Sequence, residues 1–275
     1  MHESPAPGNE PTPPDPRRAP LEYQGRAASG DGDNAAWPFV LPMVIFLALV
    51  FVGNWREEWH AWAYAARTFI VGGLLIWLWP RLRRDVEWTH LPLGAAVGVF
   101  GLVQWVGMDK LLQLVRDQFP DDWRLAGLWN LLISGVRPGE GYDPVSQVLE
   151  PAGVIAFVAF VLVRTLGPVL VVPVMEELFW RNWLWRNIIS PNNWRLAAIG
   201  EPDKIAFIGT CVAFSLVHPQ RLVSLVWALL IAWLLVRTRS IGACIVAHAV
   251  TNLLLALYVL IATRALGQTS EWYFW

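Results

Sequence analysis

Charged residues are scarce in this chain. Lys, Arg, Asp and Glu make up 16 % of the 275 residues, whereas a soluble domain usually carries about 25 %. Hydrophobic residues make up 55 %, and they come in long runs rather than in alternation with polar ones. The runs therefore predict membrane-spanning α-helices, and they exclude the alternating strands of a membrane β-barrel.

An excess of either charge is also missing. The 21 basic and 22 acidic residues leave a net charge of −1. Proteins that bind nucleic acid usually present a basic face, so a nucleic-acid partner is not expected. Membrane lipid is the expected surrounding, and the 18 tryptophans agree with it, because Trp collects at bilayer interfaces.

Cysteine is rare, and three familiar motifs are absent. Cys211 and Cys244 both lie in apolar segments and are interpreted as small buried hydrophobic residues. No Cys-x-x-Cys spacing occurs, so a thiolate zinc site is not expected. There is no His-Glu-x-x-His helix and no Gly-x-Ser-x-Gly turn, which excludes the usual zinc-peptidase helix and the usual serine-hydrolase elbow.

The chain divides into two regimes. Residues 1–36 are rich in Pro, Gly, Ser, Asp and Arg, and we predict a disordered tail that is not a secretory signal peptide. Residues 37–275 are predicted to form an all-α membrane domain, a polytopic bundle of transmembrane helices. The candidate spans are 37–53, 61–79, 91–108, 151–174, 204–218, 221–236 and 241–263. The runs at 204–218 and 221–236 are short for a span of about 20 residues, so tilted or re-entrant helices are possible there.

Arginine positions predict the orientation. With seven spans, three Arg clusters fall on one face, which the positive-inside rule places in the cytoplasm together with the tail. These clusters are Arg81, Arg83 and Arg84, then Arg181, Arg186 and Arg195, then Arg237 and Arg239. The loop 109–150 would then lie outside. A hairpin within 151–189, with Gly167–Pro168 as its turn, would invert this orientation downstream.

The first unusual polar site is a pair of carboxylates, Glu176 and Glu177, which continue a long apolar run. A charge at membrane depth costs about 2.5–3.5 kcal/mol on insertion scales, so such residues are candidates for function. Neighbouring helix positions point about 100° apart, so the two carboxylates have different roles. Glu177 can pair with Arg181 four residues on, which leaves Glu176 to face a cavity. A solvated helix end with an ordinary ion pair is the alternative.

Two further sites carry histidine. His218 ends an apolar run four residues after Phe214, whose ring could shield the imidazole. An interfacial or hydrogen-bonded core histidine is the alternative. His248 and Asn252 lie four residues apart within the run 241–262, so they share one helix face. Both could donate into a cavity, and the alternative is a pair of hydrogen bonds that hold two membrane helices together.

This set of side chains favours hydrolysis by an activated water. A carboxylate in a poorly hydrated cavity can act as a general base near neutral pH, and His218 could share the water with Glu176. His248 and Asn252 could donate hydrogen bonds to the oxyanion that forms when water attacks a carbonyl group. Alternatively, Glu176, His218 and His248 could hold a divalent metal such as zinc, which would acidify the water.

Taken together, the motifs resemble the CPBP intramembrane protease family, which includes the Rce1-like CAAX prenyl endopeptidases. The motifs are Glu176-Glu177-x-x-x-Arg181, Phe214-x-x-x-His218 and His248-x-x-x-Asn252. They occur in that order, and the resemblance covers roughly 150–265, the expected catalytic core. The Trp-rich ending also resembles a branch found beside bacterial exosortase systems.

The resemblance implies a membrane core of about eight helices around an intramembrane cavity that opens to the cytoplasm. It implies that Glu176 and His218 activate water and that His248 and Asn252 stabilise the oxyanion. Glu177, Arg181 and Phe214 would support them. The expected activity is endoproteolysis of a membrane-associated peptide or protein in the bacterial inner membrane, with a metal as an open question. Bacteria generally lack prenylated CAAX proteins, so a bacterial member would have another substrate.

Two other functions fit the same residues. One is a non-enzymatic immunity or scaffold protein of this family, and the other is a transporter with charges along its path. The main difficulty for the enzyme hypothesis is the depth of Glu176 and His218 in the membrane. In a simple seven-span arrangement, Glu176 and His218 lie near opposite helix ends and could be some 20 Å apart. The difficulty disappears if 204–218 is a short, tilted helix or if the extra hairpin exists.

Overall fold

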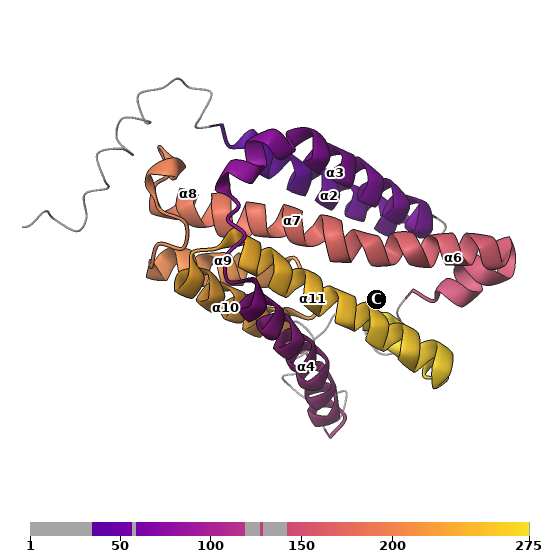
Figure 1. Ribbon diagram of the computed structural model, residues 1–275. Coiled ribbons are helices and arrows are strands. Elements are labelled where there is room, and N and C mark those ends of the chain that lie inside the picture. Colours follow the sequence, from indigo (N-terminus) through magenta and orange to yellow (C-terminus); the bar gives the residue numbers. More distant parts are fainter. Residues whose placement is uncertain (1–34, 57–58, 119–126, 129–141, 275) are drawn as a thin grey trace, which may run out of the picture. The chain divides into compact units, whose positions relative to one another are not determined.

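The computed structural model describes residues 35–56, 59–118, 127–128 and 142–274, and the predicted tail 1–36 lies almost entirely outside them. Within these ranges the secondary structure is helical throughout, as predicted (Figure 1). The longer helices before the middle of the chain are α2 (Trp37–Trp55), α3 (His60–Leu82) and α4 (Leu91–Arg116). Those that follow are α6 (Glu150–Leu166), α7 (Val172–Glu176), α8 (Trp185–Ile189), α9 (Lys204–Leu216), α10 (Arg221–Thr238) and α11 (Ile241–Leu260).

Among the described residues, six helical stretches are long and apolar enough to cross a membrane. They are Trp37–Trp55, His60–Asp85, Leu91–Arg116, Val145–Ile189, Arg221–Thr238 and Ile241–Ala265. The seventh predicted span is the apolar helix α9, whose 13 residues are too few to cross. The prediction of an all-α transmembrane bundle is therefore confirmed.

The fourth stretch has no hairpin turn at Gly167–Pro168. Its helix passes through Gly167–Pro168 without reversing, because a π-helical turn, Gly167–Val171, takes up the proline between α6 and α7. A second π-helical segment, Glu177–Leu184, joins α7 to α8. The only interruption is at Gly153, whose φ of 80° and ψ of 177° are not helical. The alternative turn at Gly167–Pro168 is therefore absent, and the chain continues as one helix, the long helix, from Val154 to Ile189.

Another boundary also differs from its prediction. The loop expected to begin at residue 109 begins only after α4 ends at Arg116. Asp109 is buried and bonds to Gln113 one helical turn later, so this carboxylate does not end the helix. The span predicted as 91–108 is therefore too short, because the charge of Asp109 was taken as its end.

The basic segments meet at one end of the helical domain, as predicted. Arg195 pairs with Asp85 at 3.1 Å, which ties the end of α3 to the loop after α8. The Ser240 hydroxyl donates to the Glu87 carbonyl at 2.7 Å, which ties the α10–α11 turn to the segment before α4. Arg181 is the exception, since it is buried at 2 % exposure inside the protein. Placement of this end in the cytoplasm stays a prediction.

Helices α4 and α11 make a close contact through glycine. A Cβ atom at Gly94 would lie 2.5 Å from the Ala243 carbonyl oxygen, and one at Gly98 would lie 2.6 Å from that of Ala247. The spacing Gly94-x-x-x-Gly98 is the small-residue pattern that lets membrane helices approach. Gly94 faces Ala243, and four residues later Gly98 faces Ala247, so the two helices run in the same direction. Figure 1 shows that they diverge toward their C-terminal ends.

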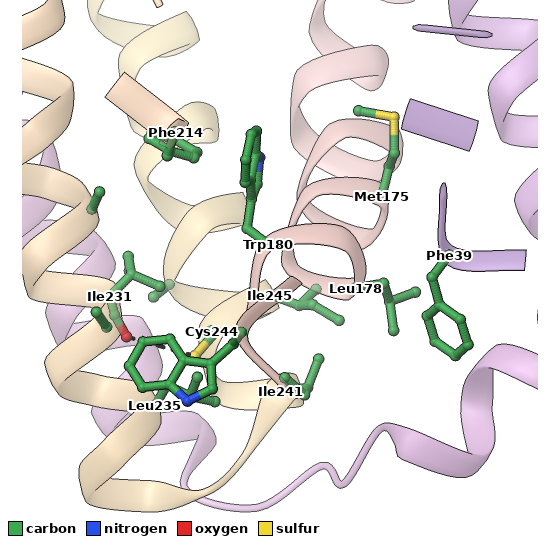
Figure 2. Packing of buried hydrophobic residues seen from close by; sticks show 14 of the residues in the cluster. Phe39, Met175, Leu178, Trp180, Phe214, Ile231, Leu235, Ile241, Cys244 and Ile245 are labelled. Carbon is green, nitrogen blue, oxygen red and sulfur yellow. Dashed lines mark hydrogen bonds between the residues drawn. The ribbon is translucent and has the colours of Figure 1, made fainter. Parts of the chain in front are cut away.

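The largest hydrophobic core lies where the second half of the long helix meets α9, α10 and α11. Figure 2 shows Trp180 beside Phe214, and Leu178 toward Phe39 of α2. The Trp180 and Phe214 rings meet edge to face with centroids 5.9 Å apart. Cys211 and Cys244 are buried in this core as free thiols, as their apolar sequence context predicted.

Candidate active site

The carboxylate pair lies in the middle of the long helix, at the start of the π-helical segment. The Glu177 side chain is 0 % exposed. Its Oε2 atom lies 3.3 Å from Arg181 Nε, which confirms the predicted ion pair four residues apart. Its Oε1 atom lies 2.8 Å from Nδ1 of His248 on α11. Glu177 therefore joins the first motif to the third through a contact across 71 residues of sequence.

Glu176 lies beside this arrangement. It is 5 % exposed, and its Oε2 atom is buried without a hydrogen-bond partner among the described residues. It lies within electrostatic range of His248, Glu177 and Arg181. Among the described residues, Glu176 is not part of the cavity lining given below. Its part in catalysis stays a prediction.

His218 follows the end of α9. Its Nδ1 atom lies 2.8 Å from the Phe214 carbonyl oxygen. A carbonyl oxygen only accepts, so Nδ1 donates and the neutral imidazole has its free lone pair on Nε2. The ring stacks on Phe214 with centroids 4.2 Å apart. Burial lowers the pKa of His218 to about 4, so the ring is neutral at pH 7.

Trp227 of α10 connects the two histidines. Its ring meets His248 edge to face at 4.6 Å and stacks on Phe214 at 5.4 Å. The Arg181 guanidinium lies 4.6 Å from the Phe214 ring centroid and 5.5 Å from that of Trp227. The cation therefore has a carboxylate on one side and two ring faces within cation–π distance, which limits the cost of burying it.

Asn252 lies one turn after His248 on α11. Its Nδ2 atom donates to the Pro168 carbonyl at 2.7 Å. Pro168 lies in the π-helical turn of the long helix, so this bond joins two helices. Asn252 therefore has the interhelical hydrogen bond that was the alternative to a catalytic role. A side-chain amide has two N–H donors, and the bond to Pro168 uses one of them. The second donor is available to a ligand.

A cavity of about 100 Å³ lies among these groups. It is lined by Trp105, Val172, Phe214, His218, Trp227, His248, Thr251, Asn252 and Leu255. The structure therefore brings the second and third motifs to one small cavity, with the first motif directly behind His248. A volume of this size holds a water molecule and part of a substrate chain.

The lengths of the helices show that the Glu176–Glu177 pair and His218 do not lie on opposite sides of the membrane domain. The long helix continues to Ile189, so Glu177 lies about 18 Å from its end at 1.5 Å per residue. Helix α9 has only 13 residues, which carries the chain about 20 Å from the same end before His218. The two motifs therefore lie at similar depth. The first explanation offered from the sequence, a short helix at 204–218, agrees with this structure, and the hairpin does not.

A metal held by Glu176, His218 and His248 stays a prediction. Nδ1 of His218 is bonded to a carbonyl oxygen and Nδ1 of His248 to Glu177, bonds that also occur behind metal-binding histidines, so Nε2 is the ring atom that could act as a ligand. Among residues 35–56, 59–118, 127–128 and 142–274, no three His, Cys, Asp or Glu side chains are placed to hold a metal ion. We therefore derive no step through a metal from Glu176, His218 and His248.

Several residues of the site have no place in the three motifs. Thr251 bonds the Gly98 carbonyl at 3.0 Å, and Trp227 Nε1 lies 3.5 Å from the Thr251 hydroxyl. Pro168 supplies the carbonyl that holds Asn252. The small-residue spacing on α4 was a signal that could have predicted the α4–α11 contact. No comparable pattern marks Trp227, because tryptophan is frequent throughout this chain.

The described residues contain six membrane-length helices, a cavity lined by two histidines and an amide, and a buried carboxylate behind His248. These features define an integral membrane protein with a polar site inside its helical core. Residues 157–254 match the family described as type II CAAX prenyl endopeptidase Rce1-like, and this segment contains all three motifs. The match confirms the resemblance predicted from those motifs, and over this segment the chain is similar to proteins of the CAAX-protease type. No curated protein and no solved structure matches the chain.

Proposed function

We propose that this protein is an intramembrane endopeptidase of the CPBP type that cleaves a membrane-associated peptide or protein by attack of an activated water. The observation that carries the proposal is the convergence of His218, His248 and Asn252 on one cavity, with Glu177 bonded to His248. These are the groups that a hydrolysis without a covalent intermediate needs: a base for the water and donors for the oxyanion.

His218 is the base best supported by geometry. Its Nδ1 proton is committed to the Phe214 carbonyl, so Nε2 offers a lone pair to a water. Glu176 is proposed to share that water, and rotation of its side chain toward the cavity would bring the two groups together. A base positioned in this way typically contributes a factor of about 10² to 10⁴ in rate.

His248 and Asn252 are proposed to act on the carbonyl oxygen of the scissile bond. Asn252 offers its second amide hydrogen directly. The bond from His248 Nδ1 to Glu177 leaves Nε2 for the cavity, and this nitrogen donates when the ring is protonated. Glu177 is proposed to act through the bond to Nδ1, which orients the His248 ring toward the cavity.

The lipid-facing helices support a substrate that reaches the cavity from within the membrane. Many large apolar side chains are exposed on the spans, for example Ile76 at 78 % and Ile155 at 88 %. Such surfaces are stable only against lipid. A bacterial inner membrane is the proposed location, with the basic end of the domain in the cytoplasm.

The test uses purified protein in lipid nanodiscs with a pool of synthetic peptides that carry a lipid anchor, and mass spectrometry to detect cleavage. We expect Glu176→Gln and His218→Asn each to lower the cleavage rate by about 100-fold or more. The matched control is Glu150→Gln, which changes an exposed carboxylate on the α6 part of the same long stretch and should leave the rate unchanged.

The alternatives give different results. Wild-type rates in both site variants would refute the peptidase and favour a scaffold protein that keeps the motifs for structure. Uptake of a solute into liposomes that depends on Glu176, without cleavage, would favour a transporter. Folding of each variant is checked by size-exclusion chromatography and circular dichroism, so that a loss of activity is not a loss of structure.

A further inference from the structure

The C-terminal segment Thr269–Phe274 packs between the diverging ends of α4 and α11. Trp272, Tyr273 and Phe274 are buried, and they form a second hydrophobic cluster with Val259 of α11. The ring centroids of Tyr258 and Phe274 lie 6.1 Å apart. This aromatic segment contacts the later halves of α4 and α11, after the close contact at Gly94 and Gly98. The facing side chains there are larger than glycine.

Polar side chains fasten the segment to both helices. The Tyr273 hydroxyl donates to the buried Asp109 carboxylate and lies 2.8 Å from Gln113 Nε2, both on α4. On the other side, the Tyr258 hydroxyl of α11 donates to Glu271 at 2.5 Å. Lys110 of α4 pairs with the same carboxylate at 3.2 Å. The segment is therefore bonded to the two helices that it separates.

The same segment contacts two walls of the cavity. Trp105 of α4 and Leu255 of α11 pack against the C-terminal cluster, and both also line the cavity beside His218 and Asn252. The cavity therefore lies between the close contact of α4 with α11 on one side and the C-terminal segment on the other. Any change in the spacing of the two helices at Trp105 and Leu255 changes the width of the cavity.

We propose that the segment Thr269–Phe274 is a wedge that sets the distance between α4 and α11 and thereby fixes the size of the side chain that the cavity admits. This rests on the proposed function, since it assigns a specificity determinant to the same cavity. The wedge acts through Trp105 and Leu255 and touches no reacting group, so it is a positioning element and not a catalytic one.

The test measures access to the cavity and needs no cleavage assay, so its outcome is separate from that of the proposed function. A single cysteine is placed at Val172, which lines the cavity from α7, in a protein with Cys211→Ala and Cys244→Ala. Its labelling rate with 2-aminoethyl methanethiosulfonate is compared with and without the wedge variant Glu271→Gln/Tyr273→Phe, which removes polar contacts with little change in volume.

We expect the wedge variant to raise the labelling rate at position 172 by about fivefold or more, because the bonds of Tyr273 to Asp109 and Gln113 and the ion pair of Glu271 with Lys110 are lost. The control cysteine replaces Leu196, which is 47 % exposed in the loop after α8, and its labelling should not change. An equal rise at both positions would mean general loosening and would overturn the proposal.

Hydrogen exchange of the peptide that covers 266–274 shows whether the segment has been released. Release without faster labelling at position 172 overturns the proposal. If the double variant does not release the segment, Trp272→Ala removes the largest buried side chain of the wedge and is measured in the same way. Release with faster labelling confined to position 172 supports it.

Discussion

Substitution of Gly98 by alanine should separate α4 from α11. A Cβ atom there would lie 2.6 Å from the Ala247 carbonyl oxygen and 2.7 Å from Val250 Cβ. Neither neighbour is the end of a flexible side chain, so the helices must move apart. Overpacking of this kind costs about 1–3 kcal/mol. The gain in helix propensity over glycine offsets about 1 kcal/mol, so we expect a net loss of up to about 2 kcal/mol.

The matched control is Gly107→Ala on the same helix, where an added Cβ would have nothing within 4 Å. This variant keeps the propensity gain without the clash, so it should be unchanged or more stable by up to about 1 kcal/mol. The assay is unfolding of the purified protein in mixed micelles with rising SDS, followed by circular dichroism. Should Gly98→Ala unfold at the same SDS fraction as Gly107→Ala or later, the close-contact reasoning is refuted.

Two further predictions concern the buried charges and the histidine. Glu177→Ala should lower the free energy of unfolding by about 3–5 kcal/mol, because it leaves the Arg181 guanidinium buried without its carboxylate; the double variant Glu177→Met/Arg181→Met should recover most of this loss in the same SDS assay. Burial lowers the pKa of His218 from 6.5 to about 4, so between these values the unfolded imidazole binds a proton that the folded one does not. The stability that the neutral ring contributes is present above pH 6.5 and is lost as the pH falls toward 4. Thermal unfolding at pH 7 and pH 5 should therefore show a larger drop for wild type than for His218→Gln, and equal drops would contradict the prediction.

The helices and the local pairs were predictable because they depend on composition and on short spacing. Apolar runs predicted the spans, and the four-residue spacing predicted that Glu177 would pair with Arg181. The same logic failed where a charge or a proline was taken as the end of a helix. Asp109 continues α4 because Gln113 and Tyr273 bond its buried carboxylate, and Pro168 continues the long helix because a π-helical turn accommodates the ring.

Contacts between distant segments were not predictable from one sequence. The bond between Glu177 and His248 spans 71 residues, and nothing in either motif specifies the other as its partner. The orientation of Asn252 toward the Pro168 carbonyl depends on how far α11 approaches the long helix. The close approach of α11 to α4 depends likewise on glycines that lie outside all three motifs.

The kink at Gly153 has a consequence for how the chain enters the bilayer. Its backbone conformation belongs to a region that is essentially restricted to glycine. Without the kink, the 45 residues from Val145 to Ile189 would form one straight rod, about 68 Å long at 1.5 Å per residue. The hydrocarbon layer is only about 30 Å thick. A single residue without a side chain thus lets this stretch bend back instead of projecting far into water, and an alanine there would favour the straight rod during insertion.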